Sequence, residues 1–118
     1  MYNEGTIIAL SSAPGSGAIA IIRLSGEDAI SKTDLFFKSK SGKKLSESGG
    51  YSISYGDLVD NDEIIDEVVV SVYKAPHSYT GENIIEISCH GSIYIQQRIL
   101  SIFTLSLIHI WRCRRSKQ

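Results

Sequence analysis

Two charged residues of this chain lie within apolar stretches. Glu86 is part of the strand-like run 83–88, and Arg23 is the one charge in the nearly continuous apolar run 18–24. Burying a carboxylate or a guanidinium is costly unless the group is paired or hydrogen-bonded. We therefore expect each to need a partner, which makes both candidate binding residues. A Glu86 that simply faces solvent from a half-buried strand is the plain alternative.

A polar loop at residues 75–83 leads directly into the run that holds Glu86. Pro76 fixes its own φ, and Gly81 can adopt a positive φ, as turns require. Side chains that donate or accept hydrogen bonds follow one another here: Ser78, Thr80, Glu82 and Asn83. These residue types favour a ligand-binding loop, although loops of similar composition also join strands in many domains.

Several familiar motifs are present only in part. Residues 15–20 match the dinucleotide-binding pattern G-x-G-x-x-A, but residues 19–24 are β-forming where that pattern requires a helix. Residues 42–44 lack the upstream glycine and the hydroxyl of a phosphate-binding loop, and residues 60–63 lack the glycine and distal glutamate of a calcium loop. We expect a tight turn at the glycines and a hairpin turn at 60–62, with neither GTP nor calcium bound there.

Cys89 and His90 are adjacent, so on a strand they would point to opposite faces and could not share a metal ion. We expect Cys89 to be a small buried thiol and His90 to be a polar residue of a second turn, at 89–91. His77 and His90 are both expected beside the loop. No nucleophile is placed within their reach, so we assign no catalytic residue and no metal ligand.

With 118 residues and 42% apolar residues, the chain is long enough for one globular domain or a piece of one. No apolar run approaches the length of a membrane span, and no signal peptide is visible, so we expect a cytoplasmic protein with free thiols. Four of the 12 basic residues lie in the last seven positions. Without them the net charge is −5, which argues against a basic nucleic-acid face on the main body.

The expected elements are strands over 6–10 and 18–24, the second buried on both faces, and a helix signalled by Ser25 and the acid Asp28. That helix carries apolar residues at 29, 30, 36 and 37. We expect a mobile loop over 38–50, a hairpin of 51–59 with 64–73, the strand 83–88 and a second helix from 91 or 92. This order predicts an α+β fold, with two helices on one face of a mainly antiparallel mixed sheet.

Several ordered blocks of the chain resemble the amino-terminal domain of the tRNA modification GTPase family MnmE, also called TrmE. They are Thr6-Ile7-Ile8-Ala9, residues 14–26 from Pro14 to Gly26, Ile65-Asp66-Glu67, residues 76–86 from Pro76 to Glu86, and Cys89-His90-Gly91. The P-x-S-Y-T-G-E segment followed by C-H-G is the most specific part. The resemblance covers residues 6 to about 100.

The resemblance implies a homodimerising domain with the tetrahydrofolate-binding fold of the glycine-cleavage T-protein. It implies 5-formyltetrahydrofolate or a related folate as cofactor, held near the dimer interface by Arg23 and Glu86, with Ser78, Tyr79, Thr80 and Gly81 as loop contacts. A carboxylate can accept paired N–H groups of a pterin, and a guanidinium can donate to ligand oxygens or pair with an acid.

The family protein is expected to modify the wobble uridine of certain tRNAs at carbon 5, together with a flavin-containing partner protein. GTP, magnesium and potassium then belong to a GTPase domain that these 118 residues lack. A folate-dependent one-carbon transferase of the T-protein type is the alternative function, and a purely structural dimerisation domain is a third.

The final residues depart from the family. We expect the family domain over 1–102 and a non-family tail over 103–118, a scar or a frameshift, without the Lys that forms the third folate contact in the family. A genuine basic tail that contacts tRNA phosphates is the alternative for this segment.

Overall fold

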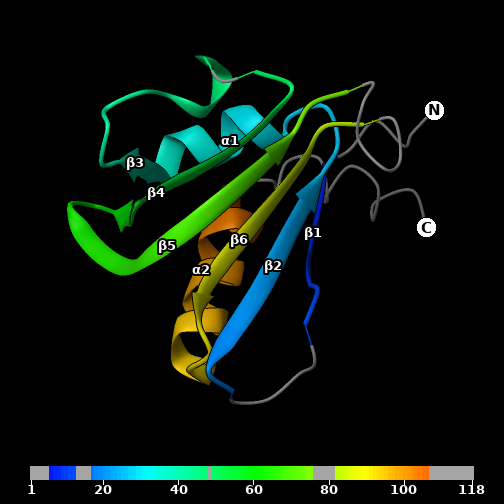
Figure 1. The fold of residues 1–118 in the computed structure, drawn as a ribbon. Helices are drawn as coiled ribbons and strands as arrows, with labels where there is room; N and C mark the ends of the chain where they lie inside the picture. Colours follow the sequence, from blue (N-terminus) through cyan, green and yellow to red (C-terminus); the bar gives the residue numbers. More distant parts are fainter. Residues whose placement is uncertain (1–5, 13–16, 48, 76–81, 107–118) are drawn as a thin grey trace, which may run out of the picture.

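The computed structural model describes residues 6–12, 17–47, 49–75 and 82–106, which fold as one six-stranded sheet with two helices packed on one face (Figure 1). The strand order is β1-β2-β6-β5-β4-β3, and all the described pairings are antiparallel. The predicted α+β class is confirmed. In chain order the elements are β1 (Ile7–Leu10), β2 (Ile19–Ser25), α1 (Ala29–Phe36), β3 (Phe37–Ser39), the short 3-10 helix η2 (Leu45–Glu47), β4 (Tyr51–Asp60), β5 (Glu63–Tyr73), β6 (Ile84–His90) and α2 (Ile93–Ser106).

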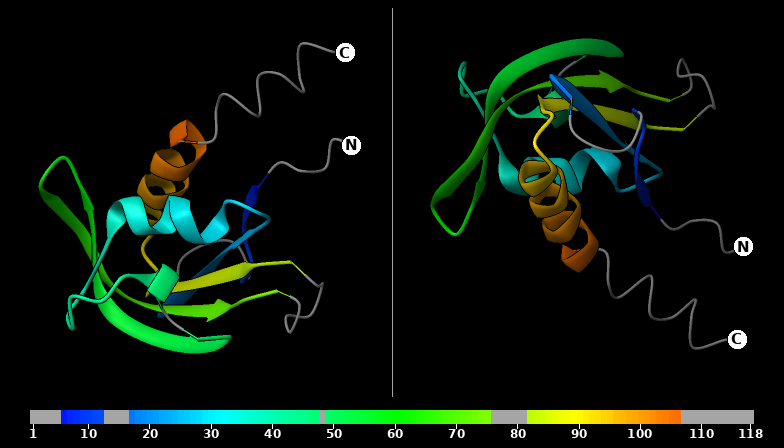
Figure 2. Two further views of the ribbon diagram at one scale, coloured as in Figure 1. Left: turned by 90° about the horizontal axis from the view of Figure 1, so that it is seen from above. Right: turned by 90° about the horizontal axis from the view of Figure 1, so that it is seen from below.

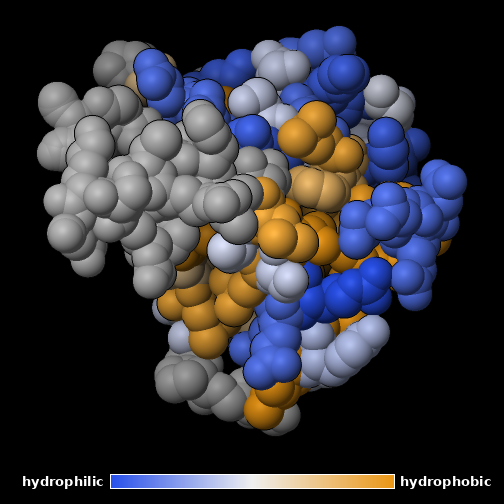
Figure 3. All heavy atoms as spheres, turned by 180° about the vertical axis from the view of Figure 1, so that it is seen from behind, coloured by the Kyte–Doolittle hydropathy of each residue, from blue (hydrophilic) through white to orange (hydrophobic). Residues whose placement is uncertain are grey.

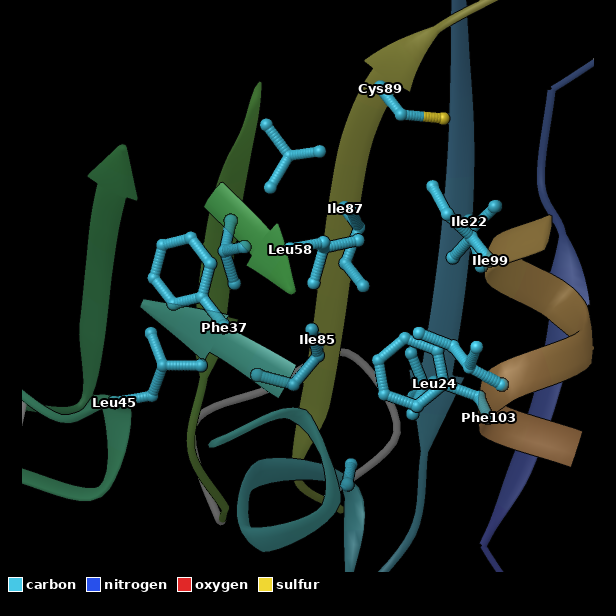
Figure 4. Packing of buried hydrophobic residues seen from close by; sticks show 14 of the residues in the cluster. Ile22, Leu24, Phe37, Leu45, Leu58, Ile85, Ile87, Cys89, Ile99 and Phe103 are labelled. Atoms are coloured by element: carbon cyan, nitrogen blue, oxygen red, sulfur yellow. The ribbon is translucent and has the colours of Figure 1, made fainter. Parts of the chain in front are cut away.

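The two helices lie on one face of the sheet (Figure 2), and the hydrophobic core lies between them and that face. Alternate residues of the central strands point into it, because successive side chains of a strand lie on opposite faces. Figure 4 shows strand residues from several strands meeting Ile99 and Phe103 of α2. The opposite face, which we call the open face, carries the other alternate residues and is covered by no described helix.

The hairpin of β4 and β5 confirms the predicted pair of strands. Asn61 and Asp62 form its two-residue turn, with φ of 51° and 66°, between the paired residues Asp60 and Glu63. Two successive positive φ angles match the right-handed twist of the flanking strands, and Asn and Asp tolerate this conformation better than most residues. The acidic segment is therefore a hairpin turn, as its sequence indicated.

Two predictions near Arg23 are wrong. β2 is buried on one face only, since Ile22 and Leu24 are fully buried while Arg23 between them is partly exposed. The first helix begins at Ala29, and Ser25 still belongs to β2. Because the chain stays extended through Ser25, that side chain cannot cap the helix; instead Thr6 Oγ1 accepts a hydrogen bond from the N–H of Asp28 at 2.8 Å.

The predicted loop 38–50 also contains regular structure. Phe37, expected on the helix, is buried in β3 instead, and β3 pairs with β4 at Gly56, where an added Cβ would lie 2.2 Å from the oxygen of Lys38. Leu45 in η2 is fully buried. A three-residue strand has too short a pattern to be recognised from sequence, and its position depends on this close contact with a glycine.

The strand β6 extends to His90, so the turn predicted at 89–91 begins only at Gly91. The second helix starts where it was expected, with Ser92 Oγ accepting a hydrogen bond from the N–H of Ile95 at 3.3 Å. The predicted apolar stripe of α2 is confirmed: Ile99, Ile102 and Phe103 are buried, and Ile95 and Leu100 pack against the core. The helix continues past residue 102, through Ser106.

Neither described helix is both long and apolar enough to cross a membrane.

Candidate binding site on the open face

The two charged residues singled out in the sequence lie side by side. Arg23 on β2 is paired in register with Glu86 on β6. Arg23 Nε donates to Glu86 Oε2 at 3.1 Å, and Nη2 donates to the same oxygen at 2.5 Å. The exposed fractions of the two side chains are 38% and 22%, so the pair is half-buried on the open face. Each charge therefore has the other as its partner.

The pair leaves hydrogen-bonding capacity toward the outside. Both donors go to Oε2, and Glu86 Oε1 accepts no hydrogen bond from a described residue. Ser71 lies directly opposite Glu86 on β5, and Ser88 is the next residue of β6 on the same face. A carboxylate oxygen accepts N–H or O–H donors, and serine hydroxyls both donate and accept. This group can therefore make further hydrogen bonds to a polar ligand that carries N–H or O–H donors.

The loop that leads into β6 is described only at its two ends. Ser78, Tyr79, Thr80 and Gly81, the predicted loop contacts, lie outside the described residues, as do Pro76 and His77. At the ends, the N–H of Ala75 donates to Asn83 Oδ1 at 2.9 Å. The backbone carbonyl oxygen of Asn83 accepts a hydrogen bond from the N–H of Gly26 at 3.0 Å. Asn83 thus ties the end of β5 to the start of β6 and to the turn after β2.

His90 is at the far end of β6, about 13 Å along the strand from Glu86 at roughly 3.3 Å per residue. The prediction that it lies beside the loop is therefore wrong. Asp66 on β5 holds it, with Oδ2 accepting from the N–H of His90 at 2.8 Å and Oδ1 lying 2.7 Å from Nδ1. The imidazole is otherwise exposed, and Asp66 orients it at the end of the central strand β6.

Cys89 points into the core, as the close-up shows, and is 3% exposed (Figure 4). Burial, and to a lesser extent the nearby charge of Asp66, raise the pKa of its thiol to about 11. A thiol that holds its proton at neutral pH is a poor nucleophile and a poor metal ligand. The prediction of a small buried thiol is confirmed. Among the described residues, no group of three or more His, Cys, Asp or Glu side chains could hold a metal ion.

The rest of the open face is apolar and aromatic on the side of β4 and β5. Tyr51 packs on Tyr73 with ring centroids 5.0 Å apart. Tyr55 Oη donates to Glu67 at 3.0 Å, and this hydrogen bond raises the tyrosine pKa. Large side chains of this face are 38–65% exposed: Ile19, Tyr51, Ile53, Tyr55 and Val69. Exposed apolar surface of this kind is typical of interaction sites.

Ser71, Ser88 and Asp66 were not among the residues predicted for a site. Their place beside Glu86 and His90 follows from the register of β5 and β6, which no local pattern reveals. The alternation of β5 in the sequence did indicate that Ser71 shares a face with Val69 and Tyr73. It could not indicate which strand pairs with β5, and so which side chains lie beside Ser71.

Together, the sheet and its two helices define a small α+β domain with one uncovered sheet face. The chain belongs to the TrmE family, in its amino-terminal part: the family described as "GTP-binding protein TrmE N-terminus" matches residues 6–117.

Curated relatives agree with this assignment. The chain is 55% identical over 97 residues to the tRNA modification GTPase MnmE of Parabacteroides distasonis, covering 80% of this chain and 21% of that protein. It is 50% identical over 102 residues to the protein of the same name from Flavobacterium johnsoniae, and 46% over 102 residues to that of Clostridioides difficile, covering 86% of this chain and 22% of each relative. The chain thus spans about a fifth of the length of these relatives.

Proposed function

We propose that this domain binds a reduced folate of the 5-formyltetrahydrofolate type at Arg23 and Glu86 and forms a homodimer through the open face. The half-buried Arg23–Glu86 pair on an uncovered sheet is the observation that carries the folate proposal. A pterin ring presents N–H donors, and Glu86 Oε1 is an acceptor that no described residue uses. Arg23 holds the carboxylate in place through the other oxygen. The residues present therefore fit this ligand.

The folate would supply a one-carbon unit when bound, and this chain's own residues would bind and orient it. Glu86 accepts hydrogen bonds from the ring, and Arg23 keeps the carboxylate oriented. Ser71 and Ser88 lie next to Glu86 on the same face and can add hydrogen bonds. The loop residues Ser78, Tyr79, Thr80 and Gly81 stay in the proposal as further contacts.

Titration calorimetry of 5-formyltetrahydrofolate into the chain tests this binding. Glu86→Gln removes the charge with little change in size, and we expect it to weaken binding at least tenfold. Glu67→Gln makes the same chemical change on the same face, next to Tyr55 instead of Arg23, and should leave the affinity unchanged. Equal affinities of the two variants, or no binding by the folded wild-type chain, would refute the folate site.

The homodimer proposal is supported by the exposed apolar side chains of the open face. Ile53 is 59% exposed there, whereas Leu35, 62% exposed, lies on α1 on the helix side of the sheet. Light scattering of the two variants Ile53→Lys and Leu35→Lys distinguishes the faces. We expect the first to be a monomer and the second to stay a dimer. A wild-type monomer, or dimers of both variants, would contradict pairing through this face.

In the full-length protein we propose a cytoplasmic role in modifying the wobble uridine of tRNA at carbon 5, with a flavin-containing partner. The support is the name of the relatives, tRNA modification GTPase MnmE. GTP, magnesium and potassium would be bound outside these 118 residues. Complementation tests this role: a full-length gene carrying this domain should restore the modified uridine in a strain that lacks the relative, and the same gene with Glu86→Gln should not.

A further inference from the structure

The basic residues of the described chain are gathered in one segment. Five of the eight lie between residues 32 and 44: Lys32, Lys38, Lys40, Lys43 and Lys44. Over residues 32–47, which we call the lysine segment, five lysines meet two acids, a net charge of +3. The other described residues hold three basic groups and ten acids. The net charge of the chain without its last residues adds this basic segment to the acidic remainder. That sum is negative, so it argued against a basic face although one segment is basic.

The structure fixes the backbone of the lysine segment. Leu45 is fully buried beneath it. Asp34 on α1 accepts the N–H of Leu45 at 2.8 Å with one carboxylate oxygen and the N–H of Ser46 at 3.2 Å with the other. Lys74 Nζ donates to the oxygen of Ser46 at 3.0 Å, from the end of β5. A segment held in this way can present its side chains at defined positions.

The acids of the segment are engaged by backbone groups instead of lysines. Both oxygens of Asp34 are used as described, and Glu47 Oε1 accepts the N–H of Lys44 at 3.2 Å. Within the described chain, no carboxylate lies within 4.0 Å of the ammonium groups of Lys38, Lys43 and Lys44. Lys40 differs, because its Nζ is 3.4 Å from Asp57 Oδ2 and 3.8 Å from Glu67 Oε2. Three lysines are therefore available to an anionic partner.

We propose that the lysine segment binds the phosphate backbone of tRNA, through Lys38, Lys43 and Lys44. This inference rests on the proposed role in tRNA modification. Lysine ammonium groups contact phosphates without reading the bases, so the contact positions the RNA and does not select its sequence. Figure 3 shows hydrophilic side chains, acidic and basic alike, on the side of the molecule that carries β3, the segment after it and the β4–β5 hairpin.

The proposed RNA contact is separate from the folate site. β5 and β4 lie between β6, which holds Glu86, and β3, which carries Lys38. At roughly 4.8 Å between neighbouring strands, Glu86 and Lys38 are about 14 Å apart across the sheet. One domain can therefore hold both partners.

Fluorescence anisotropy with labelled, unmodified tRNA tests the proposal, measured between 50 and 200 mM salt. The variant Lys38→Gln/Lys43→Gln/Lys44→Gln removes three charges from the segment. Its matched control, Arg112→Gln/Arg114→Gln/Arg115→Gln, removes three charges from the end of the chain. We expect the segment variant to bind at least tenfold more weakly and to lose about two from the slope of log affinity against log salt, given roughly 0.7–0.9 per phosphate contact. The control should bind like the wild type.

If the control variant lost tRNA binding while the segment variant bound like the wild type, the proposal would be overturned, because the tail would then be the RNA contact. A wild-type chain that does not bind tRNA at 50 mM salt would also overturn it. The unfolding midpoint and the folate affinity of the segment variant should equal those of the wild type; a lower midpoint that accounts for the lost binding would count against a direct contact. If the wild-type chain bound tRNA but not folate, the folate site would be refuted and the RNA contact would not.

Discussion

Arg23 and Glu86 are 63 positions apart in the chain and directly opposite each other in the sheet, and two nitrogens of the guanidinium donate to one carboxylate oxygen. A double-mutant cycle with Arg23→Met and Glu86→Gln should give a coupling free energy of about 1 kcal/mol, since the pair is charge-assisted but partly screened by solvent. Urea unfolding of the four proteins at low salt measures it. A coupling of zero would mean that the pair is not formed in solution.

Gly91 is predicted to be intolerant of any side chain. A Cβ added there would lie 2.0 Å from the oxygen of Gly17, which runs alongside it, so Gly91→Ala must push two backbone segments apart. We expect it to lower the free energy of unfolding by about 3 kcal/mol. Gly50→Ala is the matched control, because nothing lies within 4 Å of a Cβ at that position. Equal thermal midpoints of the two variants would contradict the close packing.

Phe103 is predicted to be essential to the core, although it lies beyond the boundary expected after residue 102. Its ring is fully buried and meets Phe36 edge-on with centroids 5.1 Å apart. Phe103→Ala should cost about 3–5 kcal/mol, whereas Leu105→Ala, at a residue 63% exposed, should cost less than about 0.5 kcal/mol. Thermal unfolding by circular dichroism compares the two. Similar small losses would place residue 103 outside the folded core.

Cys89 is predicted to be unreactive in the native state. Mainly because of burial, its pKa is raised from 9.0 to about 11, so between these pH values the folded chain keeps a proton that the unfolded chain releases. Stability contributed by this group is present below pH 9 and is lost as the pH rises from 9 to 11, by on the order of 2 kcal/mol.

Alkylation by iodoacetamide at pH 8 checks the state of this thiol in a Cys113→Ser background, where Cys89 is the one remaining cysteine. Modification should be slow in buffer and fast in denaturant. Rapid native modification would show that the thiol is accessible. Urea unfolding at pH 8 and at pH 10.5 measures the expected loss of stability.

Local patterns in the sequence were sufficient for most of the elements. The hairpin, its turn at Asn61 and Asp62, the apolar stripe of α2 and the strand around Glu86 were all recognised from residue types and period. The short strand β3 and the late start of α1 were not. Both depend on contacts with distant residues, Gly56 for β3 and Thr6 for the N–H of Asp28, which local propensity does not contain.

The sequence by itself determined that Arg23 and Glu86 each needed a partner, because a charge within an apolar run is costly to bury. Only the tertiary structure decided that they are partners of each other, that Ser71 and Ser88 lie beside them, and that Asp66 holds His90. The physical reason is register. The spacing of apolar residues along the chain depends only on residues close in sequence. The register of β2, β5 and β6 is set by the packing of the whole sheet on α1 and α2.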